Sequence, residues 1–201
     1  MNSKNSVNTK KLVLLAILTA IILVLQFVAA QIKLGTFSIT LALTPIIIGA
    51  ALCGVAAGAY LGLLFGFVVL ITGDAALFMA VNIPGTIITV LMKGMLAGLI
   101  SGLVYKLLER KNQFIAALSA GIVSPIVNTG VFFIGCLLFF SDFCTQLATE
   151  NGMTGNIFYV IAVLFIGGNF FVELAVNGIL AGTIVTLVKN GRKILRLESK
   201  G

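Results

Sequence analysis

The sequence has no histidine and no tryptophan, and only three of its 201 residues are cysteines. Without histidine, and with Cys53, Cys136 and Cys144 too widely spaced for a metal-binding pattern, we expect neither a transition metal nor a cofactor. Cys136 and Cys144 lie eight residues apart across an expected helix end. A disulfide between them stays open at this point, although packing as small apolar side chains is the simpler expectation.

Charge is also scarce, because only 9% of the residues are charged while 60% are hydrophobic, with a mean hydropathy of +1.19. A soluble domain needs far more charge to cover its surface. The composition therefore predicts one integral membrane domain over residues 1–201, multi-pass and in the plasma membrane. No separate soluble region is expected.

The net charge of +7 comes mainly from basic residues at the N-terminus, after the central apolar run and at the C-terminus. These residues are Lys4, Lys10, Lys11, Lys106, Arg110, Lys111, Lys189, Arg192, Lys193, Arg196 and Lys200. Such clusters mark the cytoplasmic ends of membrane spans and not a nucleic-acid-binding face. On this topology Lys33 falls outside the cell and Lys93 falls within the membrane.

The apolar residues form long runs, and a membrane-spanning helix needs about 20 residues. The runs are Leu12–Ala30, Leu41–Thr72, Ile83–Tyr105, Phe114–Phe140 and Ile157–Val188. To keep the basic clusters on one side, the second run must cross an even number of times, as two short helices that turn near Cys53-Gly54. The last run must cross once, as one long or tilted helix. The predicted fold is all-α, with six transmembrane helices, short second and third helices and both termini cytoplasmic.

The first apolar run shares features with a secretory signal peptide, since Lys10-Lys11 precede it and Val28-Ala29-Ala30 resembles a cleavage site. Its apolar core of 19 residues is longer than the roughly 7–15 of such a peptide. An uncleaved first helix is therefore expected.

Small residues recur every four positions in several runs, which places each set on one helix face. The sets are Gly54, Gly58, Gly62 and Gly66; Gly94, Gly98 and Gly102; Ala16 and Ala20; and Gly178 and Gly182. Missing side chains let helix backbones approach closely. For the glycine sets we expect packing within the bundle, whereas a groove for a partner's helices is the alternative.

Three polar segments are expected on the outer side: Gln31–Thr40, Gly73–Asn82 and Ser141–Asn156. The first alternates apolar and polar residues and predicts a short strand or hairpin over the bundle. The second contains Asp74 and leads to Pro84, which is placed to open the next helix. The third is long and glycine-bearing, as in a movable lid.

Two charges lie inside apolar runs, Lys93 and Glu173. An ammonium in hydrocarbon costs roughly 2.5–3.5 kcal/mol on insertion scales, so such a residue usually faces a cavity or a partner. Lys93 and Glu173 either form a buried salt bridge or contact a ligand, Lys93 through a carboxylate or phosphate. Further candidate ligand contacts are Asp74, Asn82, Asn128, Thr129, Asn169 and Asn177. A single Asn or Thr inside a helix is better explained as a hydrogen bond between helices, but the set on the later helices, with Lys93 and Glu173, favours a pocket.

The chain resembles the substrate-binding S components of energy-coupling factor (ECF) vitamin transporters. These are small six-helix proteins with basic residues before a first helix that carries an Ala-xxx-Ala motif, here Ala16 and Ala20. The stretch Phe37–Gly58 resembles their loop and second-to-third helix region, with Pro45-xxx-Gly49 before the turn at Gly54–Gly58. The resemblance covers the whole chain, although Val55 stands where proline is common.

The resemblance implies a high-affinity binding subunit for a water-soluble vitamin, docked on a membrane scaffold protein and two ATPases. It implies that Ala16 and Ala20 face the scaffold, while the first loop, the loop with Asp74 and the later helices hold the vitamin. The chain has no tryptophan or histidine to stack on an aromatic ring, and Lys93 lies in the pocket region. A small acidic vitamin is therefore favoured over a large aromatic one. Pantothenate is the first candidate; riboflavin, folate and pyridoxine-type vitamins stay open.

Other functions fit the residues less well. An intramembrane enzyme needs a catalytic constellation, and Asp74 and Asp142 lie in different loops with no histidine available. A stand-alone secondary transporter or channel is the main alternative, but such carriers often show internal repeats, and the two halves share only glycine spacing. A purely structural subunit has no need of Lys93.

Overall fold

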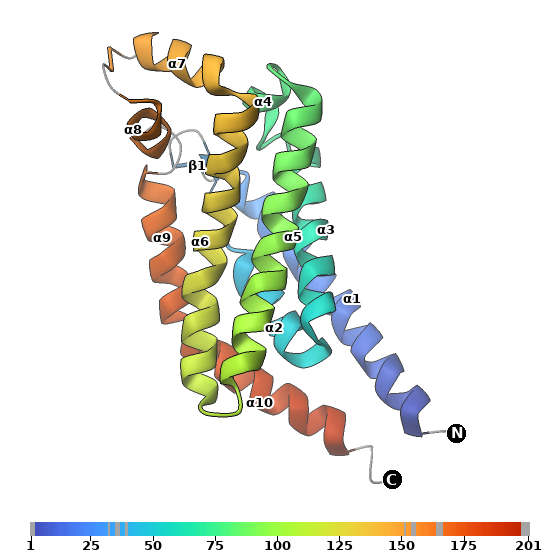
Figure 1. The fold of residues 1–201 in the computed structure, drawn as a ribbon. Helices are drawn as coiled ribbons and strands as arrows, with labels where there is room; N and C mark the ends of the chain where they lie inside the picture. The colour runs from blue at the N-terminus through green and yellow to red at the C-terminus, as the bar shows by residue number, and fades with distance from the viewer. Residues whose placement is uncertain are drawn as a thin grey trace.

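The computed structural model describes residues 3–31, 33–34, 37–38, 40–150, 152–153, 156–163 and 167–197 (Figure 1). The elements are α1 (Ser3–Ala29), β1 (Lys33–Leu34), β2 (Phe37–Ser38), α2 (Leu43–Cys53), α3 (Val55–Ile71), α4 (Ala76–Met79), α5 (Ile83–Leu108), α6 (Gln113–Phe139), α7 (Ser141–Glu150), α8 (Ile157–Ile161), α9 (Gly167–Ile179) and α10 (Ala181–Leu197). The all-helical prediction is confirmed. The predicted hairpin in the first loop is also present, as the antiparallel pair β1–β2.

Among the described residues, three segments are long and apolar enough to cross a membrane: Thr9–Ala29 of α1, α5 and α6. The pair α9–α10 passes the same test if its two halves, which are bent by 48°, count as one span. Helices α2 and α3 are apolar but shorter, with 11 and 17 residues. The short second and third helices are therefore confirmed, and six crossings remain a prediction.

Helices α2 and α3 form the tight hairpin expected at Cys53-Gly54. Gly54 separates them with a φ of +110°, a backbone conformation that favours glycine. Its amide donates to the Ala50 carbonyl and so closes the end of α2.

The run Ile157–Val188 is not the single long helix that was predicted. It contains α8, α9 and the first half of α10, with the bend between α9 and α10 at Leu180. Gly178 and Gly182 flank this bend, and glycine pairs are a common site of sharp helix kinks. A Cβ at either glycine would meet open space, so these two residues do not serve close helix packing within the chain.

The outer polar segments are more helical than predicted. The segment Ser141–Asn156 is mostly the amphipathic helix α7, and Gly73–Asn82 contains the single turn α4. Pro84 lies in the first turn of α5, as expected, behind the cap formed by Asn82. Helix α6 runs without a break through Pro125.

The glycine sets on α3 and α5 do pack against each other, as predicted. A Cβ at Gly58 would lie 2.7 Å from the Gly98 carbonyl oxygen, and one at Gly66 would lie 2.7 Å from that of Val90. Between them Gly62 faces Gly94, where an added Cβ would overlap the backbone. This seam brings α5 against α3 and so fixes the helix that carries Lys93.

The two termini and the turn between α5 and α6 lie at one end of the molecule, while α4 and α7 lie at the other (Figure 1). At the terminal end Arg192 of α10 pairs with Glu109 in the α5–α6 turn and donates to the Ala51 carbonyl at 3.3 Å. The basic clusters thus share one end, which agrees with the charge pattern. That this end is cytoplasmic stays a prediction.

Candidate functional site

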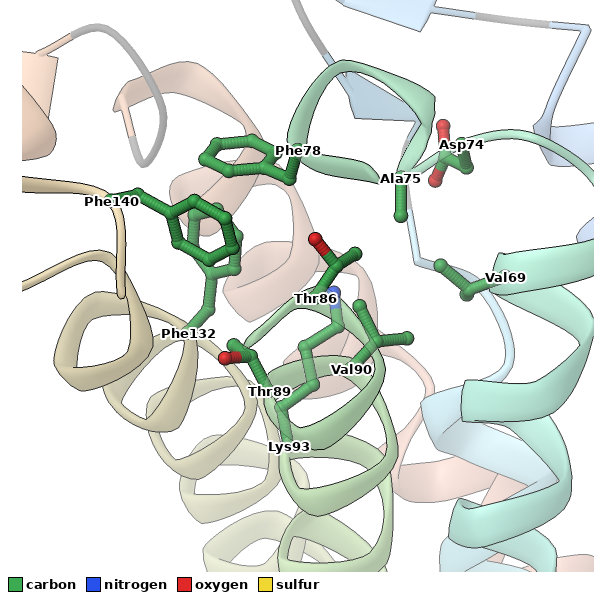
Figure 2. A pocket seen from close by; sticks show the side chains of 10 residues that line it. All are labelled: Val69, Asp74, Ala75, Phe78, Thr86, Thr89, Val90, Lys93, Phe132 and Phe140. Atoms are coloured by element: carbon green, nitrogen blue, oxygen red, sulfur yellow. The ribbon is translucent and has the colours of Figure 1, made fainter. Parts of the chain in front are cut away.

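A small cavity lies between α3, α5, α6 and the turn before α4, towards the α4 and α7 end (Figure 2). Its lining residues are Val69, Asp74, Ala75, Phe78, Thr86, Thr89, Val90, Lys93, Phe132 and Phe140. Its free volume is about 20 Å³, which is room for about one water molecule. A larger ligand requires the surrounding elements to move apart.

Lys93 is the cation of this cavity. Figure 2 shows its side chain extending from α5 towards Thr86, one of the residues two helical turns earlier on the same face. The ammonium lies 5.5 Å from the centre of the Phe132 ring, a distance that suits a cation–π interaction. Next to it the buried Thr89 hydroxyl makes no hydrogen bond within the described part of the chain.

Aromatic rings close the cavity on the α4 side. Phe78 of α4 makes edge-to-face contacts with Phe132 and Phe140, with ring centres 5.4 and 4.9 Å apart. It contacts Phe143 of α7 in the same way at 5.8 Å. These contacts join α4, α6 and α7 in one apolar cluster, so the path from that end to Lys93 leads past phenylalanine rings.

A second group of polar side chains surrounds Glu173 of α9. The carboxylate is 4% exposed, and its Oε1 accepts a hydrogen bond from the Thr40 amide at 3.1 Å. Its Oε2 accepts none within the described residues. Asn128 of α6 lies beside it, is equally buried, and has an unpartnered Oδ1. Since a buried polar atom without a partner costs about 1–3 kcal/mol, this arrangement suits a ligand that carries hydrogen-bond donors.

Asn177 is already satisfied by the protein. Its Oδ1 accepts from the Thr44 hydroxyl at 3.0 Å, and its Nδ2 donates to the Glu173 carbonyl at 2.8 Å. It joins α9 to α2 one turn below Glu173. The geometry therefore gives Asn177 a packing role. The acceptors without a hydrogen-bond donor among the described residues are Glu173 Oε2 and Asn128 Oδ1.

Lys93 and Glu173 do not form an ion pair in the described structure, where the recorded pair is Arg192–Glu109. The Lys93 ammonium still interacts electrostatically with the Glu173 carboxylate at longer range. The buried salt bridge considered from the sequence is not formed in the described structure. Without an ion pair between them, the two opposite charges are consistent with the ligand alternative.

The other predicted site residues divide into several groups. Asp74 lines the Lys93 cavity, on the side of α3 and Ala75 (Figure 2). Asn82 caps α5 by accepting from the Gly85 amide at 2.9 Å and does not line this cavity. Thr129 is half-buried on α6, next to Asn128 in sequence. Asn169 belongs to α9, but its side chain lies outside the described residues.

Several polar residues near the centre were not predicted as site residues. Thr40 and Thr44 hold Glu173 and Asn177 from the start of α2, and Gln26 of α1 is buried with an unpartnered Nε2. Gln26 is a lone amide in an otherwise apolar span, so the sequence carried a signal for it. Thr40 carried none, because it contributes its backbone amide.

This set of groups offers a cation, hydrogen-bond acceptors and aromatic rings to a ligand. In the described part of the chain no three histidine, cysteine, aspartate or glutamate residues are placed to hold a metal ion. Cys136 and Cys144 are both free and buried, so they pack as apolar side chains as expected. The site offers one cation, buried acceptors and aromatic walls.

The sequence model of a family described as "ECF transporter, substrate-specific component" matches residues 10–189. The chain belongs to this family. It is a family of transporter components and not of enzymes. No curated protein matches the sequence.

Among solved structures, the substrate-specific component is similar to ThiT from Listeria monocytogenes, with a TM-score of 0.60 and 23% sequence identity. The match covers 93% of this chain and 99% of the other. At this identity the likeness shows a shared fold. The Ala16 and Ala20 of this chain are both exposed on α1.

Proposed function

We propose that this protein is the high-affinity vitamin-binding subunit of an ECF-type, ATP-driven importer in the plasma membrane. The observation that carries the proposal is the set of buried polar atoms without hydrogen-bond partners among the described residues: Thr89 Oγ1 in the Lys93 cavity, and Asn128 Oδ1 and Glu173 Oε2. They belong to α5, α6 and α9, so a ligand bound between these helices would satisfy all three. The site lies towards the α4 and α7 end, which we assign to the outside of the cell.

The charges favour a vitamin with a carboxylate and several hydrogen-bond donors. Its carboxylate would pair with Lys93, and amide or hydroxyl donors would reach Glu173 and Asn128. Pantothenate carries all of these groups and is the first candidate. Asp74, Asn82, Thr129, Asn169 and Asn177 stay predicted contacts, of which Asn177 already has protein partners for both ends of its amide.

The partners follow from the energy source. The sequence has no motif for ATP hydrolysis, so an active importer needs two ATPase subunits and a membrane scaffold that links them to this chain. Ala16 and Ala20 are exposed one turn apart on α1, which permits close approach of a partner helix. We assign this face to the scaffold.

The function is tested by native mass spectrometry of gently purified protein, followed by titration with a panel of water-soluble vitamins. We expect one bound small molecule that excess of the same vitamin displaces, with a nanomolar dissociation constant. Tight binding of a vitamin without an acidic group would overturn the role of Lys93. An empty protein that ignores the whole panel, but transports a solute alone in liposomes, would establish the stand-alone carrier instead.

The docking face is tested separately with the exposed variant Ala16→Trp. We expect it to lose co-purification with the scaffold and ATPases while vitamin binding stays unchanged. Leu138→Trp is the matched control, because Leu138 is 70% exposed on α6, away from α1. Equal co-purification of both variants with the scaffold would remove Ala16 from the interface.

A further inference from the structure

A second, larger hollow lies on the side of the molecule between α1, α2 and α10, with a volume of about 550 Å³. Its lining is almost entirely aliphatic, with Leu14, Ile17, Leu18, Ile21 and Leu25 from α1. Thr44 and Asn190 are its polar members, and Thr44 is already bonded to Asn177. We call this hollow the α1–α10 groove. It is distinct from the Lys93 cavity, because the two share no lining residue.

Basic side chains continue the groove at the end of the molecule that carries the termini. Lys11 precedes Leu14 by three positions and Leu18 by seven, and Lys10 precedes Leu14 by four and Ile17 by seven, so both lie beyond the lining on the groove face of α1. The Lys10 ammonium is buried there. The Cys53 thiol donates to the Lys11 carbonyl at 3.7 Å and anchors this turn of α1 to the end of α2.

The opposite wall at this end is formed by α10. Gly191 lines the groove and lies against Leu52, where an added Cβ would be 2.8 Å from the Leu52 side chain. Asn190 is exposed beside it, and Lys193 follows one turn later. The groove therefore combines an apolar channel along α1 with basic residues at one end.

We infer that the α1–α10 groove binds one anionic phospholipid, with an acyl chain along α1 and the headgroup phosphate at Lys10 and Lys11. The groove complements a lipid, with aliphatic side chains for the hydrocarbon and ammonium groups at one end for the phosphate. Zwitterionic lipid lacks the net charge that this end favours. Ala16 and Ala20 are exposed, outside this lining, so the lipid leaves the proposed docking face open.

The test uses the full chain in mild detergent, titrated with phosphatidylglycerol or with phosphatidylcholine of the same acyl chains, and native mass spectrometry to count bound lipids. We expect one retained phosphatidylglycerol and much weaker retention of phosphatidylcholine. The double variant Lys10→Gln/Lys11→Gln is expected to lower the affinity for phosphatidylglycerol roughly tenfold or more. Ile17→Trp, which fills the groove from a half-exposed position, is expected to abolish retention.

Lys106→Gln/Lys111→Gln is the matched control, because both lysines are exposed at the same end on α5 and its following turn. It removes the same charge and should leave retention unchanged. Equal loss in this control, equal binding of both lipids, or full retention in Ile17→Trp would each overturn the inference. A photoreactive group at Ile21 that cross-links in cell membranes to another protein and not to phospholipid would assign the groove to a protein partner and also overturn it.

Discussion

Lys93 lies inside an apolar bundle without a direct ion pair in the described structure. Its ammonium is held by the Phe132 ring and by more distant carboxylates, while the neighbouring Thr89 hydroxyl is unpartnered. An ammonium so placed is a cost to the folded protein, which a bound carboxylate would offset. The side chain is therefore better suited to binding than to stability.

Replacing Lys93 with methionine separates these two roles. Lys93→Met keeps a long side chain in the cavity but removes the charge, so we expect unchanged or higher thermal stability. Affinity for the acidic vitamin should fall by about 3 kcal/mol, or roughly 100-fold. Thermal unfolding and calorimetric titration measure the two effects. An affinity within a factor of two of the wild type would show that Lys93 does not contact the vitamin.

A substitution at Glu173 tests whether its Oε2 atom accepts a hydrogen bond from the vitamin. Glu173→Gln keeps an oxygen for the Thr40 amide but replaces the free acceptor with an amide NH2, so the fold should persist. We expect vitamin affinity to fall by about 2 kcal/mol, or roughly 30-fold. Asn177→Ala is the contrasting variant: because both ends of that amide are bonded, it should lose stability instead. Reversed behaviour of the two variants would place the ligand at Asn177.

The sequence identified the charged centre of the site but not its surroundings. Lys93 and Glu173 could be found because a charge in an apolar run is conspicuous. The phenylalanine wall could not, because Phe78, Phe132 and Phe140 look like any membrane-facing aromatic residue until the fold brings them together. Asn82 shows the opposite problem: the sequence suggested a ligand contact, and the structure shows a helix cap. An amide side chain before Pro84 suits either role, so the sequence could not separate them.

At the scale of elements, glycine spacing was a reliable guide only where a partner helix exists. The α3 and α5 sets meet backbone to backbone, whereas Gly178 and Gly182 have the same spacing and face open space at a bend. Charge parity predicted the α2–α3 hairpin, but it could not predict the bend in Ile157–Val188. A kink changes no charge and no hydropathy, so neither signal records it.

One added methyl group distinguishes the two kinds of glycine. Gly62→Ala places a Cβ into the Gly94 backbone, and we expect a loss of about 1–3 kcal/mol in the free energy of unfolding. Gly182→Ala adds the same group where nothing lies within 4 Å, and it should be neutral or stabilising by about 0.5–1 kcal/mol. Thermal unfolding in one detergent compares them. Equal midpoints would mean that the α3–α5 seam is looser than described.

At the scale of the whole molecule, the basic clusters and the α4–α7 region lie at opposite ends, so sidedness can be measured with two positions. Thr145 is exposed on α7, and Lys111 is exposed in the turn after α5. In intact cells a membrane-impermeant thiol reagent should label Thr145→Cys but should label Lys111→Cys only after permeabilisation. The opposite pattern would invert the predicted topology and place the vitamin site on the inner side.

The cavity beside Lys93 also has a consequence for the time course of uptake. The Lys93 cavity has free volume for about one water molecule, so we expect Phe78 and its neighbours to separate before a vitamin reaches Lys93. Association is then limited by this opening step and not by diffusion. In a stopped-flow experiment the observed rate should rise with vitamin concentration and then level off at the opening rate. A rate that stays linear into the high micromolar range would mean that the aromatic wall is already open in solution.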